Sequence, residues 1–134
     1  MMRLSSVRDW LKSLRIGEHF YIGKLDNKQE QSIGVYGQQR SAPPVMAIGG
    51  LSCSSYDLMS AKILVHWNKN ADESERAARE LYSALLNRTH FSINNTTIYY
   101  LELENPEPVN IGSDDNGVYE WVIEFTIHYE RNAE

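Results

Sequence analysis

Residues 119–129 read YEWVIEFTIHY, and this stretch decides the fold. Its odd-numbered positions are all apolar or aromatic: Tyr119, Trp121, Ile123, Phe125, Ile127 and Tyr129. Its even-numbered positions are mostly polar, and successive side chains of a strand point to opposite faces of a sheet. Eleven alternating residues would span about 36 Å, roughly twice the usual strand length. We therefore expect a long strand in the middle of a twisted antiparallel sheet.

Two amphipathic helices are expected to cover the apolar face of that sheet. Residues 71–87 carry a wide apolar stripe and follow Asn70, a capping residue with Glu73 three positions later. A shorter apolar stripe follows Ser5 and Ser6, and one or the other of these serines is expected to cap a first helix. Gly17 is expected to end this first helix.

Shorter alternating runs predict the other strands, over residues 19–25, 32–36, 57–67, 90–93 and 97–103. The first two look like a hairpin, and the last two flank an Asn94-Asn95 turn. Polar segments with prolines, at residues 37–50 and 104–117, are predicted loops. The sequence thus predicts one α+β domain over residues 1–134, with two helices packed on one face of a twisted, mainly antiparallel sheet of about five or six strands.

Composition narrows the class of protein. The chain has 134 residues, 42% of them hydrophobic and 23% charged, as in an ordinary globular domain. Its single cysteine, Cys53, excludes an internal disulfide and a cysteine-based metal cluster. No run approaches the roughly 20 apolar residues that a membrane helix needs. Residues 1–10 lack the pattern of a secretory signal, so we expect the chain to be made and to stay in the cytoplasm or in a particle assembled there.

The charge is divided unevenly along the chain. The net charge of −5 argues against a dedicated nucleic-acid binder. Residues 1–67 carry eight Lys or Arg and five Asp or Glu, a net of +3, whereas residues 68–134 carry five and thirteen, a net of −8. Such a division fits either a solvated acidic edge or a polar subunit whose unlike surfaces meet head to tail.

Catalytic and ligand-binding motifs were not found. The sequence contains neither a P-loop nor a G-x-G-x-x-G pattern, and no G-x-S-x-G elbow. The four histidines, His19, His66, His90 and His128, show no H-x-x-x-H spacing. The acidic turn at residues 114–117 does not fit the calcium-loop pattern, because Gly112 falls where the first Asp belongs. These observations favour a protein that works through its shape and its contacts, with no cofactor and no metal.

The order of the motifs resembles the bacteriophage tail terminator family, some of whose members are called minor capsid proteins of phages and prophages of Gram-positive bacteria. The resemblance runs from the first helix to Arg131 and is carried by four stretches and the helix at 71–87. The stretches are SIGVYG at 32–37, AKILVHW at 61–67, PVNIGSDD at 108–115 and residues 119–131, with Gly49-Gly50 leading into Tyr56.

The resemblance implies a structural virion protein of the tail or neck, assembled in the bacterial cytoplasm. Its implied form is a homo-hexameric ring that stops growth of the tail tube and forms the surface for joining the head. The implied partners are further copies of the chain, the major tail tube protein and a head–tail connector or stopper protein. As contact residues we predict Arg40 and Tyr56 in the region of the first polar segment, and Asp114 and Asp115 in the region of the second.

Two other functions remain open on sequence grounds. The first is a different neck component, such as a head-completion or connector protein. The second is a small enzyme or ligand-binding module, for which His66, His128 and Glu124 are the candidate residues if their strands are neighbours.

Overall fold

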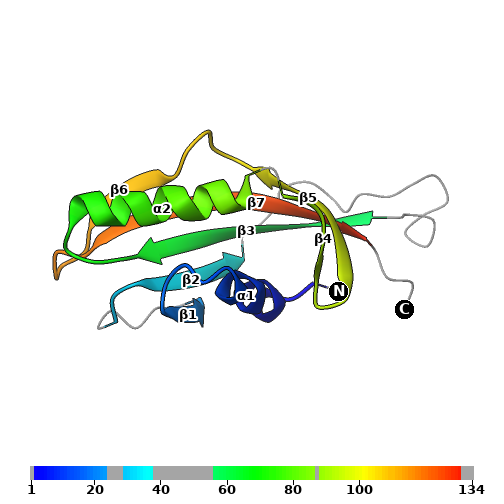
Figure 1. The fold of residues 1–134 in the computed structure, drawn as a ribbon, viewed down its shortest axis with the longest axis horizontal. Coiled ribbons are helices and arrows are strands. Elements are labelled where there is room, and N and C mark those ends of the chain that lie inside the picture. Colours follow the sequence, from blue (N-terminus) through cyan, green and yellow to red (C-terminus); the bar gives the residue numbers. More distant parts are fainter. Residues whose placement is uncertain (1, 24–28, 38–55, 87, 131–134) are drawn as a thin grey trace.

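The computed structural model describes residues 2–23, 29–37, 56–86 and 88–130, which contain two helices and seven strands. All seven strands belong to one sheet of order β1-β2-β3-β7-β5-β4, with β6 also paired to β7 (Figure 1). The strands are β1 (His19–Ile22), β2 (Ser32–Gly37), β3 (Tyr56–His66), β4 (Thr89–Ile93), β5 (Thr96–Leu103), β6 (Val109–Ser113) and β7 (Tyr119–Glu130).

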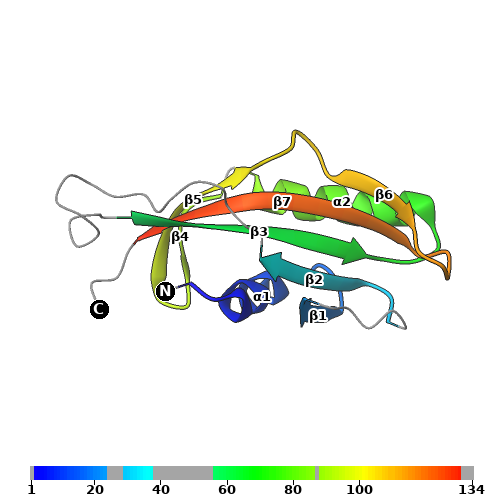
Figure 2. The same ribbon diagram turned by 180° about the vertical axis from the view of Figure 1, so that it is seen from behind.

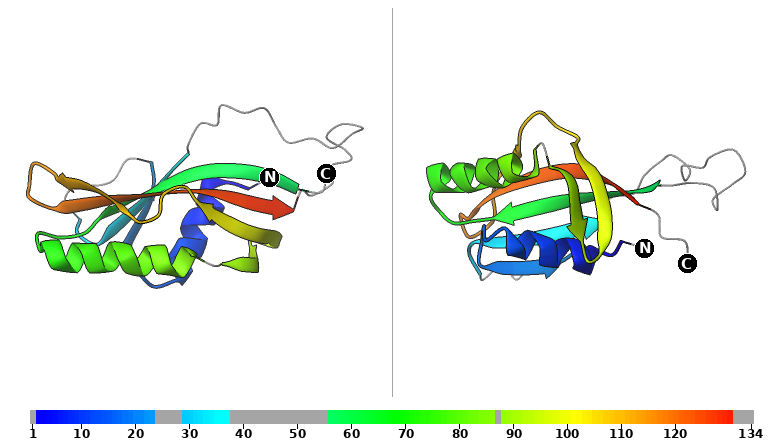
Figure 3. Two further views of the ribbon diagram at one scale, coloured as in Figure 1. Left: turned by 90° about the horizontal axis from the view of Figure 1, so that it is seen from above. Right: turned by 45° about the vertical axis from the view of Figure 1, so that its right-hand side comes forward.

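The helices α1 (Leu4–Ser13) and α2 (Ala71–Leu85) bury their apolar stripes in one shared core. Leu11 of α1 and Leu81 of α2 join Ile63 of β3 and Phe125 of β7 in that core. Both helices therefore cover the same face of the sheet (Figure 3), and the other face carries no helix of the described chain. The predicted α+β architecture is confirmed.

Strand β7 is the centre of the sheet, as its alternation predicted. It pairs antiparallel with β3 from Tyr56 opposite Glu130 to His66 opposite Glu120. On its other side, β5 pairs with residues 125–129 and β6 with residues 119–122. The strand is bonded on both sides and buries its odd-numbered side chains from Trp121 to Tyr129.

Helix α2 begins as the sequence predicted. The Asn70 side chain accepts a hydrogen bond of 3.0 Å from the backbone N–H of Glu73, which satisfies one of the open donors of the first turn. On the exposed side of α2, Arg79 pairs with Glu75 and Arg76 pairs with Asp72, each at 3.0 Å and four residues apart.

Helix α1 begins and ends earlier than predicted. Its N-cap is Arg3, which makes no side-chain cap, so Ser5 and Ser6 lie inside the first turn. The helix ends at Ser13 because Arg15 adopts a positive φ of 60°, before the chain reaches Gly17. Gly17 serves the following turn instead. It has a φ of 92°, and a Cβ there would lie 3.0 Å from Cδ1 of Ile33.

The expected hairpin at residues 19–36 is wrong, because β1 and β2 run parallel, with His19 opposite Ser32 and Ile22 opposite Val35. A hairpin would need a tight turn, whereas nine residues separate β1 from β2. The alternation of residues 19–25 and 32–36 predicts each strand but not the direction in which the two strands pair. β2 pairs antiparallel with β3, and β1 adds to its outer side.

The expected loop at residues 104–117 is also partly wrong, because it contains β6. This strand pairs with the part of β7 that β5 leaves open, from Val109 opposite Val122 to Ser113 opposite Tyr119. The register shifts between Asn110 and Gly112, where Gly112 has a φ of 90°. The bulge breaks the alternation in the sequence, so periodicity alone does not reveal the strand. β6 brings the sheet to seven strands.

The sheet curls at the end that carries β4 and β5. The register of β5 against β7 shifts between Ile98 and Tyr100, and the β4–β5 hairpin bends toward α1 (Figures 1 and 2). There Phe91 stacks on Trp10 of α1 with the ring centroids 5.0 Å apart. Asn94 and Asn95 both adopt positive φ at the tip of the hairpin, as predicted for that turn.

Candidate interaction surfaces

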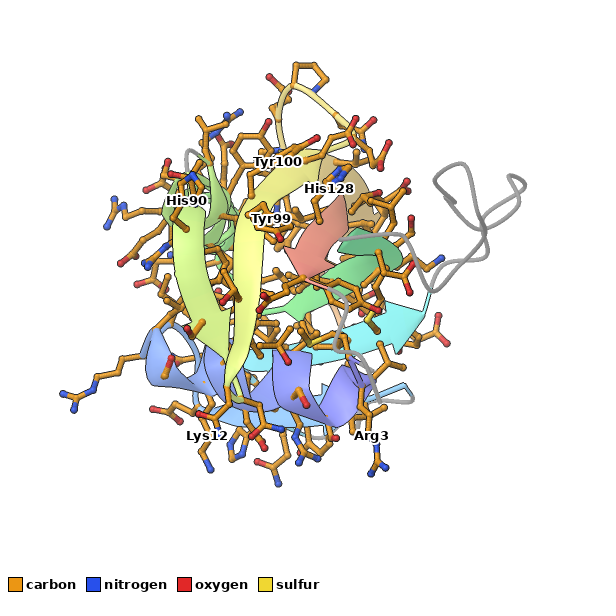
Figure 4. All side chains as sticks on the ribbon, turned by 90° about the vertical axis from the view of Figure 1, so that its right-hand side faces the viewer. Arg3, Lys12, His90, Tyr99, Tyr100 and His128 are labelled. Atoms are coloured by element: carbon orange, nitrogen blue, oxygen red, sulfur yellow. The ribbon has the colours of Figure 1, made fainter. Side chains whose placement is uncertain are left out.

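The face of the sheet that the helices leave open carries an ordered row of polar side chains. Ser60 and Thr126 lie 3.0 Å apart on neighbouring strands, and the Thr126 hydroxyl donates a 2.6 Å hydrogen bond to Glu104. Further along, Nε2 of His128 lies 2.8 Å from Glu102, and the Tyr100 ring stacks on the His128 ring at 4.1 Å (Figure 4). These contacts hold the polar groups in fixed positions.

An apolar depression interrupts this polar face near β6. It has a volume of about 250 Å³ and is lined by Tyr36, Leu64, Ile111 and Val122, with the stem of Lys62 at its side. Ile111 is 51% exposed because the bulge of β6 turns it outward. Burial, and secondly the nearby Glu120 carboxylate, raises the pKa of the Tyr36 phenol above its usual value of 10.0.

A buried histidine ties the β6–β7 turn to β3. Nδ1 of His66 lies 2.9 Å from Glu120 and 3.8 Å from Asp114, and the His66 side chain is fully buried. The other carboxylate oxygen of Asp114 accepts two 2.9 Å hydrogen bonds, from the backbone N–H groups of Asn116 and Val118. The Asp114 carboxylate thus closes the turn from within the subunit.

The two lateral edges of the molecule differ in charge. Residues 3–22, which form α1 and β1, carry four Lys or Arg against two Asp or Glu. Residues 102–115, at the end of β5 and along β6, carry five Asp or Glu and no Lys or Arg. The two segments lie at opposite edges of the sheet (Figures 1 and 2). The basic early part and the acidic late part of the sequence therefore lie on opposite sides of the folded subunit.

The comparison with known families agrees with this architecture. A family model described as bacteriophage tail terminator protein matches residues 6–131, nearly the whole chain. The chain belongs to the bacteriophage tail terminator family. It is accordingly a structural protein of the phage tail and a component of the virion. A search of curated proteins returns no match. Within the described residues, no helix is long and apolar enough to cross a bilayer.

The predicted contact residues of this tail terminator lie at different places. Arg40 lies outside the described residues. Tyr56 is the first residue of β3, opposite Glu130 at the end of β7. Asp114 and Asp115 lie at the other end of the long strands, in the turn that leads into β7, where Asp115 is exposed and Asp114 is partly buried. Tyr56 therefore lies at the opposite end of the long strands from Asp114 and Asp115. The role of all four residues in contacts stays a prediction.

The histidines proposed for an enzymatic site do not converge. His66 of β3 lies opposite Glu120 of β7, whereas His128 lies in β7 itself, opposite Leu58 of β3. Eight residues along β7 therefore separate Glu120 from His128. At about 3.4 Å per residue, that separation is roughly 27 Å. Glu124 lies midway along β7 between Glu120 and His128, so it is close to neither histidine. In the described part of the chain, no group of three or more His, Cys, Asp or Glu has a geometry that holds a metal ion.

Sequence reasoning considered His66 only as a candidate for an enzymatic or ligand-binding site and missed its burial. The pattern that could have pointed to this role is the Asp-Asp-Asn-Gly turn at 114–117, which leads into a strand that begins with Tyr119-Glu120. A single sequence does not reveal that β6 forms a hairpin with β7. The approach of Asp114 to His66 was therefore not predictable.

Proposed function

We propose that this protein forms a closed ring, of six subunits as the family resemblance implies, that ends the tail tube and presents the surface to which the head joins. The observation that carries this proposal is the family match over residues 6–131. The proposed neighbours are further copies of the chain, the major tail tube protein on one side of the ring and a head–tail connector or stopper protein on the other.

The shape and charge of the subunit support a ring. A ring forms when one surface of a subunit repeatedly meets a different surface of the next subunit. The basic α1–β1 edge and the acidic β5–β6 edge are unlike and lie on opposite sides of the sheet. Complementary potentials on two such edges favour head-to-tail contact and disfavour contact between like edges.

The long strands also support two distinct axial contacts. β3 and β7 run together from Tyr56 and Glu130 at one end to His66 and Glu120 at the other. The predicted contact residue Tyr56 lies at the first end, and Asp115 follows β6 at the second. We propose that one of these ends contacts the tail tube and the other contacts the connector, so that the strands span the thickness of the ring.

Electron microscopy of a phage that lacks this gene tests the proposal. We expect tails of uncontrolled, excessive length, because nothing stops addition of tube subunits. Tails of normal length beside unattached heads would instead identify a different neck protein. The purified protein should form rings in negative-stain images, at high concentration if association is weak. A chain that stays monomeric at every concentration, and a deletion phage with normal tails, would contradict the proposal.

A further inference from the structure

We propose that Asn116 is a site of spontaneous deamidation, and that the hydrogen bonds of Asp114 set the rate of this reaction. Asn116 is the only asparagine in the sequence that a glycine follows, and it is exposed in the turn that joins β6 to β7 (Figure 1). Deamidation converts asparagine to aspartate or isoaspartate without an enzyme. The inference depends on this turn alone and is independent of the proposed ring.

The reaction needs only two neighbouring residues and water. The backbone nitrogen of Gly117 attacks the side-chain carbonyl carbon Cγ of Asn116, and a five-membered cyclic imide forms as the Cγ–Nδ2 bond breaks. The proton of the Gly117 amide passes through solvent to the leaving nitrogen, which departs as ammonia. Water then hydrolyses one of the two C–N bonds of the imide. The product is aspartate when the new bond breaks and isoaspartate when the original peptide bond breaks.

Gly117 leaves the space beside the attacking nitrogen open. A Cβ at this position would meet no atom within 4 Å beyond its chain neighbours. Asn95 offers a comparison, because it is also exposed in a tight turn, between β4 and β5, but it is followed by Thr96. The branched Thr96 side chain obstructs the same attack. Of these two exposed asparagines, therefore, only Asn116 has an unobstructed neighbour.

The turn restrains the attacking nitrogen. The N–H group of Gly117 donates a 3.0 Å hydrogen bond to the Asp114 carbonyl, and the N–H group of Asn116 donates a 2.9 Å hydrogen bond to the Asp114 carboxylate. The same carboxylate oxygen accepts from the N–H group of buried Val118 at 2.9 Å. The Gly117 nitrogen must leave its hydrogen bond and lose its proton before it attacks. The reaction therefore starts from a briefly opened turn, and its rate follows the population of that opened form.

Deamidation changes both the length and the charge of the turn. Isoaspartate adds one methylene group to the main chain between the N–H groups of residues 116 and 118, so the Asp114 carboxylate cannot keep both hydrogen bonds in their present geometry. Either product also places a third carboxylate next to Asp114 and Asp115, and like charges at this spacing repel each other. We therefore expect the deamidated chain to be less stable than the unmodified one.

Incubation of the purified chain at neutral pH, followed by peptide mapping, tests the proposal. Mass spectrometry detects the exchange of the amide nitrogen for oxygen, and an isoaspartate-specific methyltransferase labels the rearranged product. We expect deamidation at Asn116 and none at Asn95 over the same time. Asp114→Ala should raise the rate at Asn116 about tenfold, because a turn without the carboxylate opens more often. The wild type in denaturant gives the unrestrained rate, which should be at least as high.

Matched variants separate the turn from a general loss of stability. Gly17→Ala strains a different turn, so the rate at Asn116 should stay within about twofold of the wild type. Asn116→Gln should remove the signal at this position, because the longer side chain would have to form a larger ring. Absence of deamidation at Asn116 in the folded wild type would overturn the site. Equal rates in the wild type and Asp114→Ala, or equal rates in the folded and the denatured wild type, would overturn the restraint by the turn.

Discussion

Removal of the Asp114 carboxylate should lower the free energy of unfolding by about 2–3 kcal/mol, because it leaves a buried backbone donor without a partner. Asp114 accepts 2.9 Å hydrogen bonds from the backbone N–H groups of Asn116 and Val118. Asn116 is exposed and can bond to water, whereas Val118 is only 4% exposed. Most of the cost therefore comes from Val118.

Thermal and denaturant unfolding of Asp114→Ala measure this effect. For a chain of this length, about 2–3 kcal/mol corresponds to a fall in Tm of roughly 6–12 °C. Asp114→Asn keeps the accepting oxygen, so it should recover about half of the loss. Asp115→Ala is the matched control, since Asp115 is exposed in the same turn, and its effect should stay within about 0.5 kcal/mol. Equal effects of the two alanine variants, or none at Asp114, would refute the reasoning.

Three further changes test the core, the first turn and the open face. Phe125→Ala removes a fully buried ring from the middle of β7, and it should cost about 3–5 kcal/mol in denaturant unfolding. Gly17→Ala forces a side chain into a φ of 92° and against Ile33, so a loss of about 1–2 kcal/mol is expected, and unchanged stability would contradict the strain. The pKa of Tyr36 is raised in the folded chain, so its contribution to stability is present below the usual tyrosine pKa and is lost as the pH rises above it. Tyr36→Phe should therefore lose less stability than the wild type between about pH 9 and about pH 11.

The parts of the fold that were predictable from the sequence are those in which local pattern and tertiary burial agree. The alternation of β7 and the apolar stripe of α2 both describe surfaces that pack in the core, and Asn70 caps α2 through a contact only three residues away. The Asn94-Asn95 turn likewise depends on local dihedral angles. Such features can be predicted without knowing which distant segments of the chain pack together.

The unpredicted parts depend on which segments meet. β1 pairs parallel with β2, and no residue type in β1 encodes this direction. The bulge in β6 interrupts the alternation that would have predicted a strand. β6 pairs with the part of β7 to which β5 is not paired. The burial of His66 follows in turn from the position of β6 and its turn. For the same reason, contacts with other subunits can be inferred only after the charged edges are placed in space.

The length of β7 has a mechanical consequence. This strand of 12 residues is hydrogen-bonded to β3 along one side and to β5 and β6 along the other. A pull along its axis loads the rungs of both ladders simultaneously, so the strand resists shearing and does not unzip one bond at a time. A single inserted residue would exchange its buried and open faces beyond the insertion. Insertions and deletions should therefore be tolerated in the surface turns of this protein and not within its central strand β7.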